Sequence, residues 1–244
     1  QNSQNPGRSH LSDDMELVAQ TFRRFGEDHI LEIAEEVHRK DLDVPETIIS
    51  GLANLGCFGL SIPLEYGGSS TGSTEDMHAM VIATEELSRA SLSIGGSLIT
   101  RPEILARAIE NGGTEKQKKD FLPEIASGKS MSAVAVTEPD HGSDVASITM
   151  TARKNDDDTW ELSGVKTWCT FAGRADLLMV LARTNPDLSV GHRGLSIFVV
   201  RKERIEGHSF DLKQNSGGRM QGRAIPTLGY RGMHSFEISF QDWQ

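Results

Sequence analysis

Residues 135–144 read AVTEPDHGSD, and the character of the chain changes at this segment. An apolar, strand-like run ends at Thr137, the chain then turns sharply, and Gly142 and Ser143 stand where a backbone can approach a ligand closely. Turn residues also gather in the loops of any β domain, so the segment alone is equally compatible with a polar loop after a strand. The sequence on either side of it decides between these two interpretations.

Upstream of this segment, the apolar residues recur at helical spacing. An apolar stripe covers residues 15–37, and helices are expected at residues 46–55, 74–87, 102–109 and 115–122. Pro45 stands where a proline at the first helical position would begin the helix at 46–55. Thr114 and Gln117 form a capping box for the helix at 115–122. In the helix at 74–87, Met77, Met80, Val81 and Leu87 are expected to face the core, and Glu75, Glu85 and Glu86 to face solvent.

Downstream, the pattern shortens to strands with β-branched or alternating character. They are expected at residues 131–136, 148–153, 159–165, 177–182, 195–200 and 236–240. Residues 155–158 read as a hairpin loop, and the glycine-containing stretch 213–223 as a long flexible loop. The sequence therefore predicts an α+β chain, with an all-α domain at 13–129 and a β domain at 130–244, after a disordered or trimmed N-terminus at 1–12.

The charge balance argues against two classes of partner. Lysine and arginine total 25 against 35 aspartate and glutamate residues, which gives a net charge of −10. An acidic surface disfavours binding to nucleic acid and to anionic membranes, and no apolar stretch is long enough to span a bilayer. The two distant cysteines, Cys57 and Cys169, favour a reducing compartment, expected to be the cytoplasm, or the mitochondrial matrix in a eukaryote.

Three kinds of site are disfavoured by spacing. The eight histidines and two cysteines lack metal-ligand spacing, so no metal is expected. The glycines near residue 56 do not form a dinucleotide-binding fingerprint. Asp140, His141 and Ser143 include the residue types of a hydrolase triad, but near neighbours on one loop rarely converge as a triad must.

Residues 137–144 (TEPDHGSD) resemble the TEPxxGSD signature of the acyl-CoA dehydrogenase family, and residues 166–170 (KTWCT) resemble its KxW[IV]T segment. Further similar stretches lie, in order, at residues 55–68, 85–89, 113–118 and 228–232. The resemblance covers residues 13–243 and implies the family's helical N-terminal domain followed by its β-barrel-like middle domain. The family's third domain, a C-terminal helical bundle, has no counterpart in this sequence.

The resemblance also implies a reaction. Enzymes of the family bind FAD and an acyl-CoA thioester, remove the α-proton with a glutamate, and transfer the β-hydrogen as hydride to flavin N5. Because that glutamate belongs to the third domain, no residue here is assigned as the catalytic base. The resemblance further implies an electron-transferring flavoprotein as acceptor and a homotetramer for the full-length protein.

The matching positions suggest how FAD is contacted. Val136 and Thr137 match residues that contact the N1–O2 edge of the flavin, where electron density accumulates on reduction. Thr170 matches the threonine that donates to N5. Trp168 matches a tryptophan packed on the ring system, although alone it would read as an ordinary half-buried strand aromatic.

The remaining cofactor and substrate positions lie in the same two motifs. Ser143 matches a serine that contacts acyl-CoA as well as the cofactor region, and Gly142 keeps the turn open. His141 replaces a small residue, which leaves the geometry near the phosphates open. Cys169 replaces a β-branched residue and either presents a thiol near the flavin or fills a pocket.

The choice of substrate depends on whether an arginine binds a second carboxylate on the acyl chain. Residues 94–104, 193–196 and 228–233 resemble family members that oxidise (2S)-methylsuccinyl-CoA to mesaconyl-CoA. A second carboxylate in an apolar pocket needs a cation, and Arg101 and Arg89 are the candidates, although either residue could equally form a structural salt bridge. The alternatives are a short branched-chain or glutaryl-type dehydrogenase, or a non-catalytic fragment or subunit that needs a partner chain.

Overall fold

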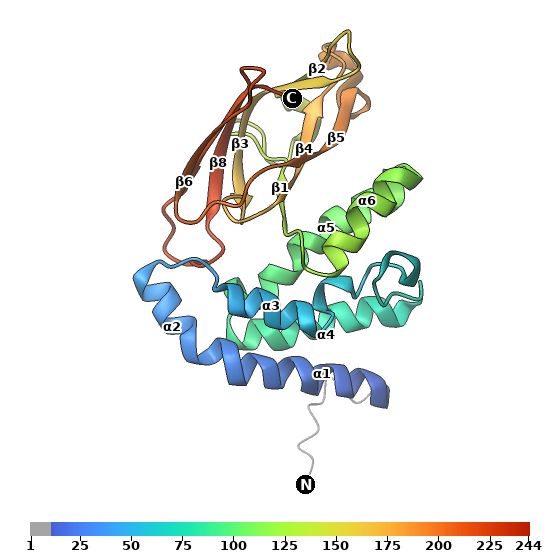
Figure 1. Ribbon diagram of the computed structural model, residues 1–244, viewed down its shortest axis with the longest axis vertical. Helices are drawn as coiled ribbons and strands as arrows, with labels where there is room; N and C mark the ends of the chain where they lie inside the picture. The colour runs from blue at the N-terminus through green and yellow to red at the C-terminus, as the bar shows by residue number, and fades with distance from the viewer. Residues whose placement is uncertain (1–10) are drawn as a thin grey trace. The chain divides into compact units, whose positions relative to one another are not determined.

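The computed structural model describes residues 11–244, which divide into a helical unit 1 and a β unit 2 with the boundary between Lys129 and Ser130. Figure 1 shows the helices of unit 1 and the strands of unit 2. The α+β class predicted from the sequence is confirmed. Among the described residues, no helix is both long and apolar enough to cross a membrane.

Unit 1 consists of helices, most of them joined by short turns, with a longer connection at residues 55–73. Its α-helices are α1 (Asp13–Phe25), α2 (Leu31–Lys40), α3 (Glu46–Asn54), α4 (Thr74–Ala90), α5 (Ser97–Gly112) and α6 (Glu115–Ala126). Two π-helical segments, η2 (Gly26–Ile30) and η5 (Leu92–Gly96), join α1 to α2 and lead into α5. Two single turns of 3-10 helix, η3 (Cys57–Gly59) and η4 (Leu64–Tyr66), lie between α3 and α4. The predicted capping box of Thr114 and Gln117 opens α6.

The buried face of α4 differs from the prediction. Met77 and Val81 are 63% and 64% exposed, so their assignment to the core was wrong. The buried face instead follows residues 79, 82, 83, 86 and 87, which keep helical spacing. Its small residues, Ala79 and Ala83, suit close packing against other helices. Glu86 can be buried on this face because Arg23 of α1 binds its carboxylate through two hydrogen bonds of 2.9 Å.

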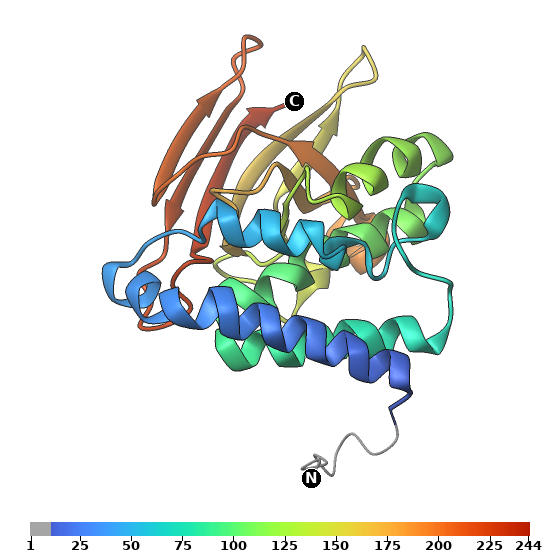
Figure 2. The ribbon, with the colours of Figure 1, turned by 60° about the horizontal axis from the view of Figure 1, so that its bottom comes forward.

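Unit 2, all of whose residues are described, is built on one eight-stranded mixed sheet. The strands are β1 (Ser132–Ala135), β2 (Thr151–Lys154), β3 (Trp160–Thr170), β4 (Leu177–Arg183), β5 (Leu195–Arg201), β6 (Ser209–Lys213), β7 (Arg219–Ala224) and β8 (Ser235–Trp243). Their order is β1-β4-β2-β3-β8-β7-β6, with β5 beside β4. The sheet curls into a half-barrel, which Figure 2 shows from a second direction. The β-barrel-like form expected from the sequence is confirmed.

The stretch 213–223, predicted as a long flexible loop, is mostly a β-hairpin. Strands β6 and β7 pair antiparallel, and only residues 214–218 form the turn between them. The strands were missed because their outward-facing side chains are polar or charged, including the Asp211–Arg219 ion pair across the hairpin. Their inward-facing residues include Phe210 and Met220, which are buried in the core of unit 2.

Candidate functional site

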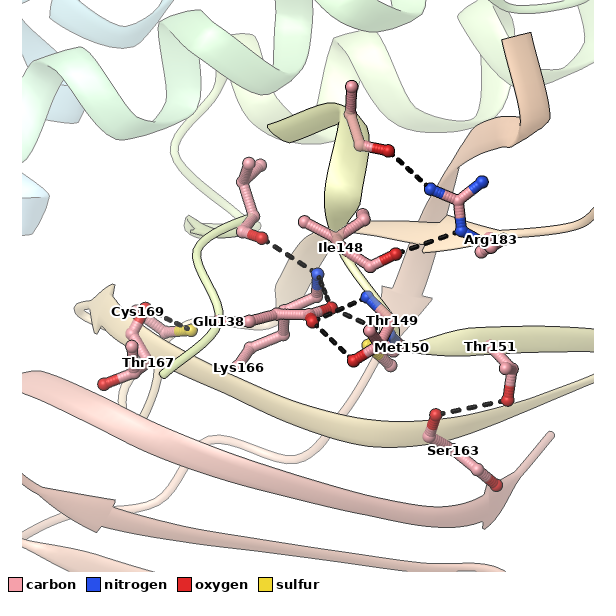
Figure 3. A network of polar contacts seen from close by, with 12 residues as sticks. Glu138, Ile148, Thr149, Met150, Thr151, Ser163, Lys166, Thr167, Cys169 and Arg183 are labelled. Carbon is pink, nitrogen blue, oxygen red and sulfur yellow. Dashed lines mark hydrogen bonds and ion pairs between the residues drawn. The ribbon is translucent and has the colours of Figure 1, made fainter. Parts of the chain in front are cut away.

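A buried ion pair joins the two motifs that the sequence singled out. Lys166 lies on β3 and Glu138 follows β1, and their side chains are 0% and 5% exposed. The Lys166 Nζ donates to Glu138 Oε1 at 3.0 Å and to the carbonyl oxygen of Val136 at 2.8 Å. Figure 3 shows this network. The ammonium group therefore binds the carbonyl of Val136, just before Thr137, and the carboxylate of Glu138, just after it.

Glu138 also accepts hydrogen bonds from the segment that leads into β2. Its Oε2 accepts from the N–H and hydroxyl of Thr149 at 2.7 and 2.9 Å, and its Oε1 accepts from the N–H of Met150 at 2.8 Å. Burial raises the pKa of Glu138, but these backbone bonds and Lys166 outweigh that effect and hold the pKa below its ordinary value. For Lys166, burial lowers the pKa and the ion pair offsets only part of this effect. Three segments of unit 2 therefore meet at one carboxylate.

Backbone bonds fix the turn after β1. The N–H of Thr167 donates to the carbonyl of Thr137 at 2.9 Å, which joins this segment to β3. Glu138 and His141 exchange two backbone hydrogen bonds of 2.9 and 3.2 Å, and these close the turn. Gly142 and Ser143 follow in an exposed position, and a Cβ at Gly142 would meet no atom within 4 Å.

The end of β3 carries a backbone irregularity. The register between β3 and β8 shifts between Lys166 and Cys169, and Trp168 within the shift has a φ of 57°. The residue is 56% exposed. A left-handed backbone at a large aromatic residue is strained and is retained only where the surroundings impose it. The end of β3 thus exposes the aromatic ring of Trp168.

Cys169 and Thr170, the next residues, are both buried, and Cys169 belongs to the core of unit 2. Thr170 is 6% exposed, and its Oγ1 lies 2.8 Å from the Oγ of Ser235 on β8. Cys169 is fully buried, its Sγ lies 3.7 Å from the carbonyl of Thr167, and burial raises its pKa to about 12. Of the two roles open to Cys169, the structure favours filling the core.

Arg183 anchors the segment before β2. This buried residue at the end of β4 donates from Nε to the carbonyl of Ile148 at 3.0 Å and from Nη2 to the carbonyl of Ala146 at 2.6 Å. Its Nη1 lies 3.4 Å from the carbonyl of Gly191. The interaction with Ile148 is visible in Figure 3. Arg183 thereby supports the backbone that supplies Thr149 and Met150 to Glu138.

The sequence interpretation assigned no role to Glu138, Lys166, Arg183 or Ser235. A signal was present for the first three, since each places a charge within or beside an apolar strand, where it must find a partner. The partners themselves are distant in the sequence, and only the fold brings them together. Ser235 carries no such signal.

The two candidate substrate arginines lie in unit 1. Arg89 on α4 forms ion pairs with Glu27 and Glu86, the latter at 3.9 Å between its Nε and Oε2. These contacts are the structural salt bridges that were its alternative interpretation. Arg101 is half-buried on α5, five residues after the π-helical segment η5. Segments of this kind are frequent at functional sites.

Comparison with known proteins gives the same assignment for both units. Residues 12–129 match the family described as acyl-CoA dehydrogenase, N-terminal domain, and residues 133–243 match acyl-CoA dehydrogenase, middle domain. The (2S)-methylsuccinyl-CoA dehydrogenase of Cereibacter sphaeroides is 40% identical over 98% of this chain and 41% of its own length. The mitochondrial isovaleryl-CoA dehydrogenase of Pongo abelii is 33% identical over 95% of this chain and 51% of its own length.

A solved structure supports the fold. The butyryl-CoA dehydrogenase of Megasphaera elsdenii superposes with a TM-score of 0.82 at 28% identity, covering 95% of this chain and 56% of that protein. The chain thus spans about half the length of the relatives that it matches. Two family profiles that together account for nearly the whole sequence show that this chain belongs to the acyl-CoA dehydrogenase family.

Proposed function

We propose that the protein containing this chain uses FAD to introduce an α,β double bond into an acyl-CoA thioester. The observation that carries the proposal is the junction of the two family motifs in unit 2, where Lys166 bonds to both Val136 and Glu138. The family uses FAD, and the residues present fit this cofactor. Trp168 offers an exposed aromatic ring, and Thr137 and Thr170 carry hydroxyl groups on the two joined segments, that of Thr170 lying 2.8 Å from the Ser235 hydroxyl.

Each of these residues has a proposed role. Val136 and Thr137 contact the pyrimidine edge of the flavin, Thr170 donates a hydrogen bond at N5, and Trp168 covers the ring and excludes water. Bound FAD supplies the acceptor for the hydride that leaves the β-carbon of the substrate. Cys169 fills the space behind these residues, as its burial supports.

The exposed turn has a role toward the thioester. Ser143 contacts the acyl-CoA, and Gly142 leaves room for the cofactor and substrate because nothing surrounds its Cβ position. No residue of unit 1 or unit 2 is assigned as the catalytic base. We further propose an electron-transferring flavoprotein as the electron acceptor and a homotetramer as the assembly, as family membership suggests.

The proposed substrate is (2S)-methylsuccinyl-CoA. The 40% identity with the Cereibacter sphaeroides enzyme supports this choice. Arg101 is the residue proposed to bind the second carboxylate, because it lies within residues 94–104, a stretch that resembles methylsuccinyl-CoA dehydrogenases. The 33% identity with an isovaleryl-CoA dehydrogenase favours, as the alternative, a short branched chain without that carboxylate.

The test uses the full-length protein. FAD content is read from the visible absorption spectrum, and turnover is followed by reduction of a dye acceptor with methylsuccinyl-CoA, isovaleryl-CoA or glutaryl-CoA. The proposal expects bound FAD and the highest kcat/KM with methylsuccinyl-CoA. Protein that neither binds added FAD nor oxidises any of the three thioesters would contradict the activity, and a preference for isovaleryl-CoA would favour the alternative.

A further inference from the structure

We infer that Glu138 and Lys166 are positioning residues: as one buried pair, they fix Val136 and Thr137 relative to Trp168 and Thr170. The inference rests on the proposed function, because it concerns the residues proposed to contact FAD. Neither Glu138 nor Lys166 is proposed to touch the cofactor. Their effect on it passes through the backbone that they hold.

The first step is the geometry of residues 136–138. Lys166 Nζ donates hydrogen bonds to the Val136 carbonyl at 2.8 Å and to the Glu138 carboxylate at 3.0 Å. The Thr167 N–H donates to the Thr137 carbonyl at 2.9 Å. Three consecutive residues are thus bound by two consecutive residues of β3. A shift of either segment along the other would break all three interactions together.

The second step concerns the strained position. Trp168 has its φ of 57° only two residues after Lys166, within the register shift of β3. Such a backbone persists where neighbouring interactions determine it more than once. The bonds at Lys166 and Thr167 hold the two residues of β3 before Trp168, and the Thr170–Ser235 contact holds the strand two residues after it.

The third step asks why a charged pair occupies this place. Burying an ion pair costs desolvation, and apolar residues of similar volume often stabilise a core at least as well. An apolar pair, however, could not hold the Val136 carbonyl or accept from Thr149 and Met150. The directional hydrogen bonds of the charged pair therefore specify the position of the segment, which apolar packing does not.

The experiment compares variants of the full-length protein by titrating FAD into the apoprotein. The variants are Lys166→Met, Glu138→Gln and the double variant Glu138→Gln/Lys166→Met, and each is assayed for FAD dissociation constant, flavin reduction potential and Tm. The matched control is Arg153→Met, which removes an exposed ion pair with Glu161 between β2 and β3. The control is expected to keep the wild-type FAD affinity and potential.

The two possible roles of the pair predict different results. A positioning role predicts that Lys166→Met weakens FAD binding by about tenfold or more, as loss of a residue that orients a binding group often does, and shifts the flavin potential. The double variant should regain Tm, because no uncompensated buried charge remains, yet bind FAD as weakly as Lys166→Met. Glu138→Gln, which keeps the side-chain shape, provides the comparison if Lys166→Met does not fold.

A purely structural role predicts lower Tm with FAD affinity and potential equal to wild type, and this result would overturn the inference. Recovery of both Tm and FAD affinity in the double variant would overturn it as well. Wild-type apoprotein that fails to bind FAD would instead overturn the proposed function, and the inference with it.

Discussion

At the scale of single residues, the hydroxyl of Thr170 is the group whose proposed role is most directly tested. Thr170→Val keeps the shape of the side chain but removes both the proposed N5 donor and the contact with Ser235 at 2.8 Å. Loss of one preorganised donor typically costs about 2.7–4 kcal/mol of transition-state stabilisation. We expect turnover to fall accordingly in stopped-flow reduction of the full-length enzyme. Ser235→Ala keeps the Thr170 hydroxyl and should have a smaller effect, and unchanged turnover in Thr170→Val would show that this residue does not face N5.

The two cysteines provide a second prediction at this scale. Burial raises the pKa of both thiols, that of Cys169 to about 12, so neither is a thiolate at neutral pH. We expect iodoacetamide at pH 8 to leave Cys57 and Cys169 unmodified in the native protein and to alkylate both after unfolding in guanidinium, as read by peptide mapping. Rapid native alkylation of Cys169 would instead support a thiol exposed beside the flavin.

At the scale of elements, the start of α4 depends on Asp76. Its carboxylate accepts hydrogen bonds of 2.8 to 3.0 Å from the Ser70 hydroxyl and from the N–H groups of residues 71, 72 and 73. Partial burial raises the pKa of Asp76, but these bonds outweigh that effect and the pKa lies below its ordinary value. The stabilisation is therefore complete above about pH 4, the ordinary value, and is lost as the pH falls through the lowered pKa.

Asp76→Asn tests this dependence on pH. Loss of such a cap should lower the free energy of unfolding by about 1 kcal/mol at pH 7. The difference from wild type should shrink at pH 3, where the wild-type carboxylate takes up protons. Urea unfolding at both pH values measures it, with Glu75→Gln in the same exposed turn as control. An equal difference at both pH values would contradict the prediction.

Elements with a local signal could be predicted from the sequence, and elements that depend on distant contacts could not. The capping box of α6 and the hairpin loop at 155–158 are encoded by adjacent residues. Strands β6 and β7 were missed because Asp211 and Arg219 pair only across the hairpin, and the face of α4 was misassigned because Glu86 is neutralised by a residue 63 positions away.

In the candidate site, too, residues with a local sequence signal could be predicted and contacts between distant residues could not. Thr137, Trp168 and Thr170 could be named because the family motifs contain them, and Val136 because it directly precedes the first motif; their roles remain predictions. The pairing of Glu138 with Lys166 could not be predicted, although both residues lie in the motifs, because they are 28 positions apart and only the fold brings them together. The strained backbone at Trp168 likewise depends on the pairing of β3 with β8.

At the scale of the whole molecule, a dicarboxylic substrate requires a positive charge in the acyl pocket. Burying an unpaired carboxylate in an acyl pocket is costly, so an enzyme for dicarboxylic thioesters must provide a fixed cation there. In an enzyme for neutral acyl chains the same cation would remain without its ligand. Discrimination should therefore operate in both directions, and it should depend on one arginine.

Arg101→Met in the full-length enzyme tests whether Arg101 supplies this positive charge. Activity on methylsuccinyl-CoA should fall by about 2–5 kcal/mol of transition-state stabilisation, the usual effect of truncating one member of a buried charge pair. Activity on isobutyryl-CoA, which lacks the second carboxylate, should change little or improve. The matched control is Arg89→Met, which breaks the ion pairs with Glu27 and Glu86 and should lower Tm while affecting both substrates equally. Equal losses on the two thioesters in Arg101→Met would make Arg101 structural, and a wild-type preference for isobutyryl-CoA in kcat/KM would replace the dicarboxylate assignment with a short branched-chain one.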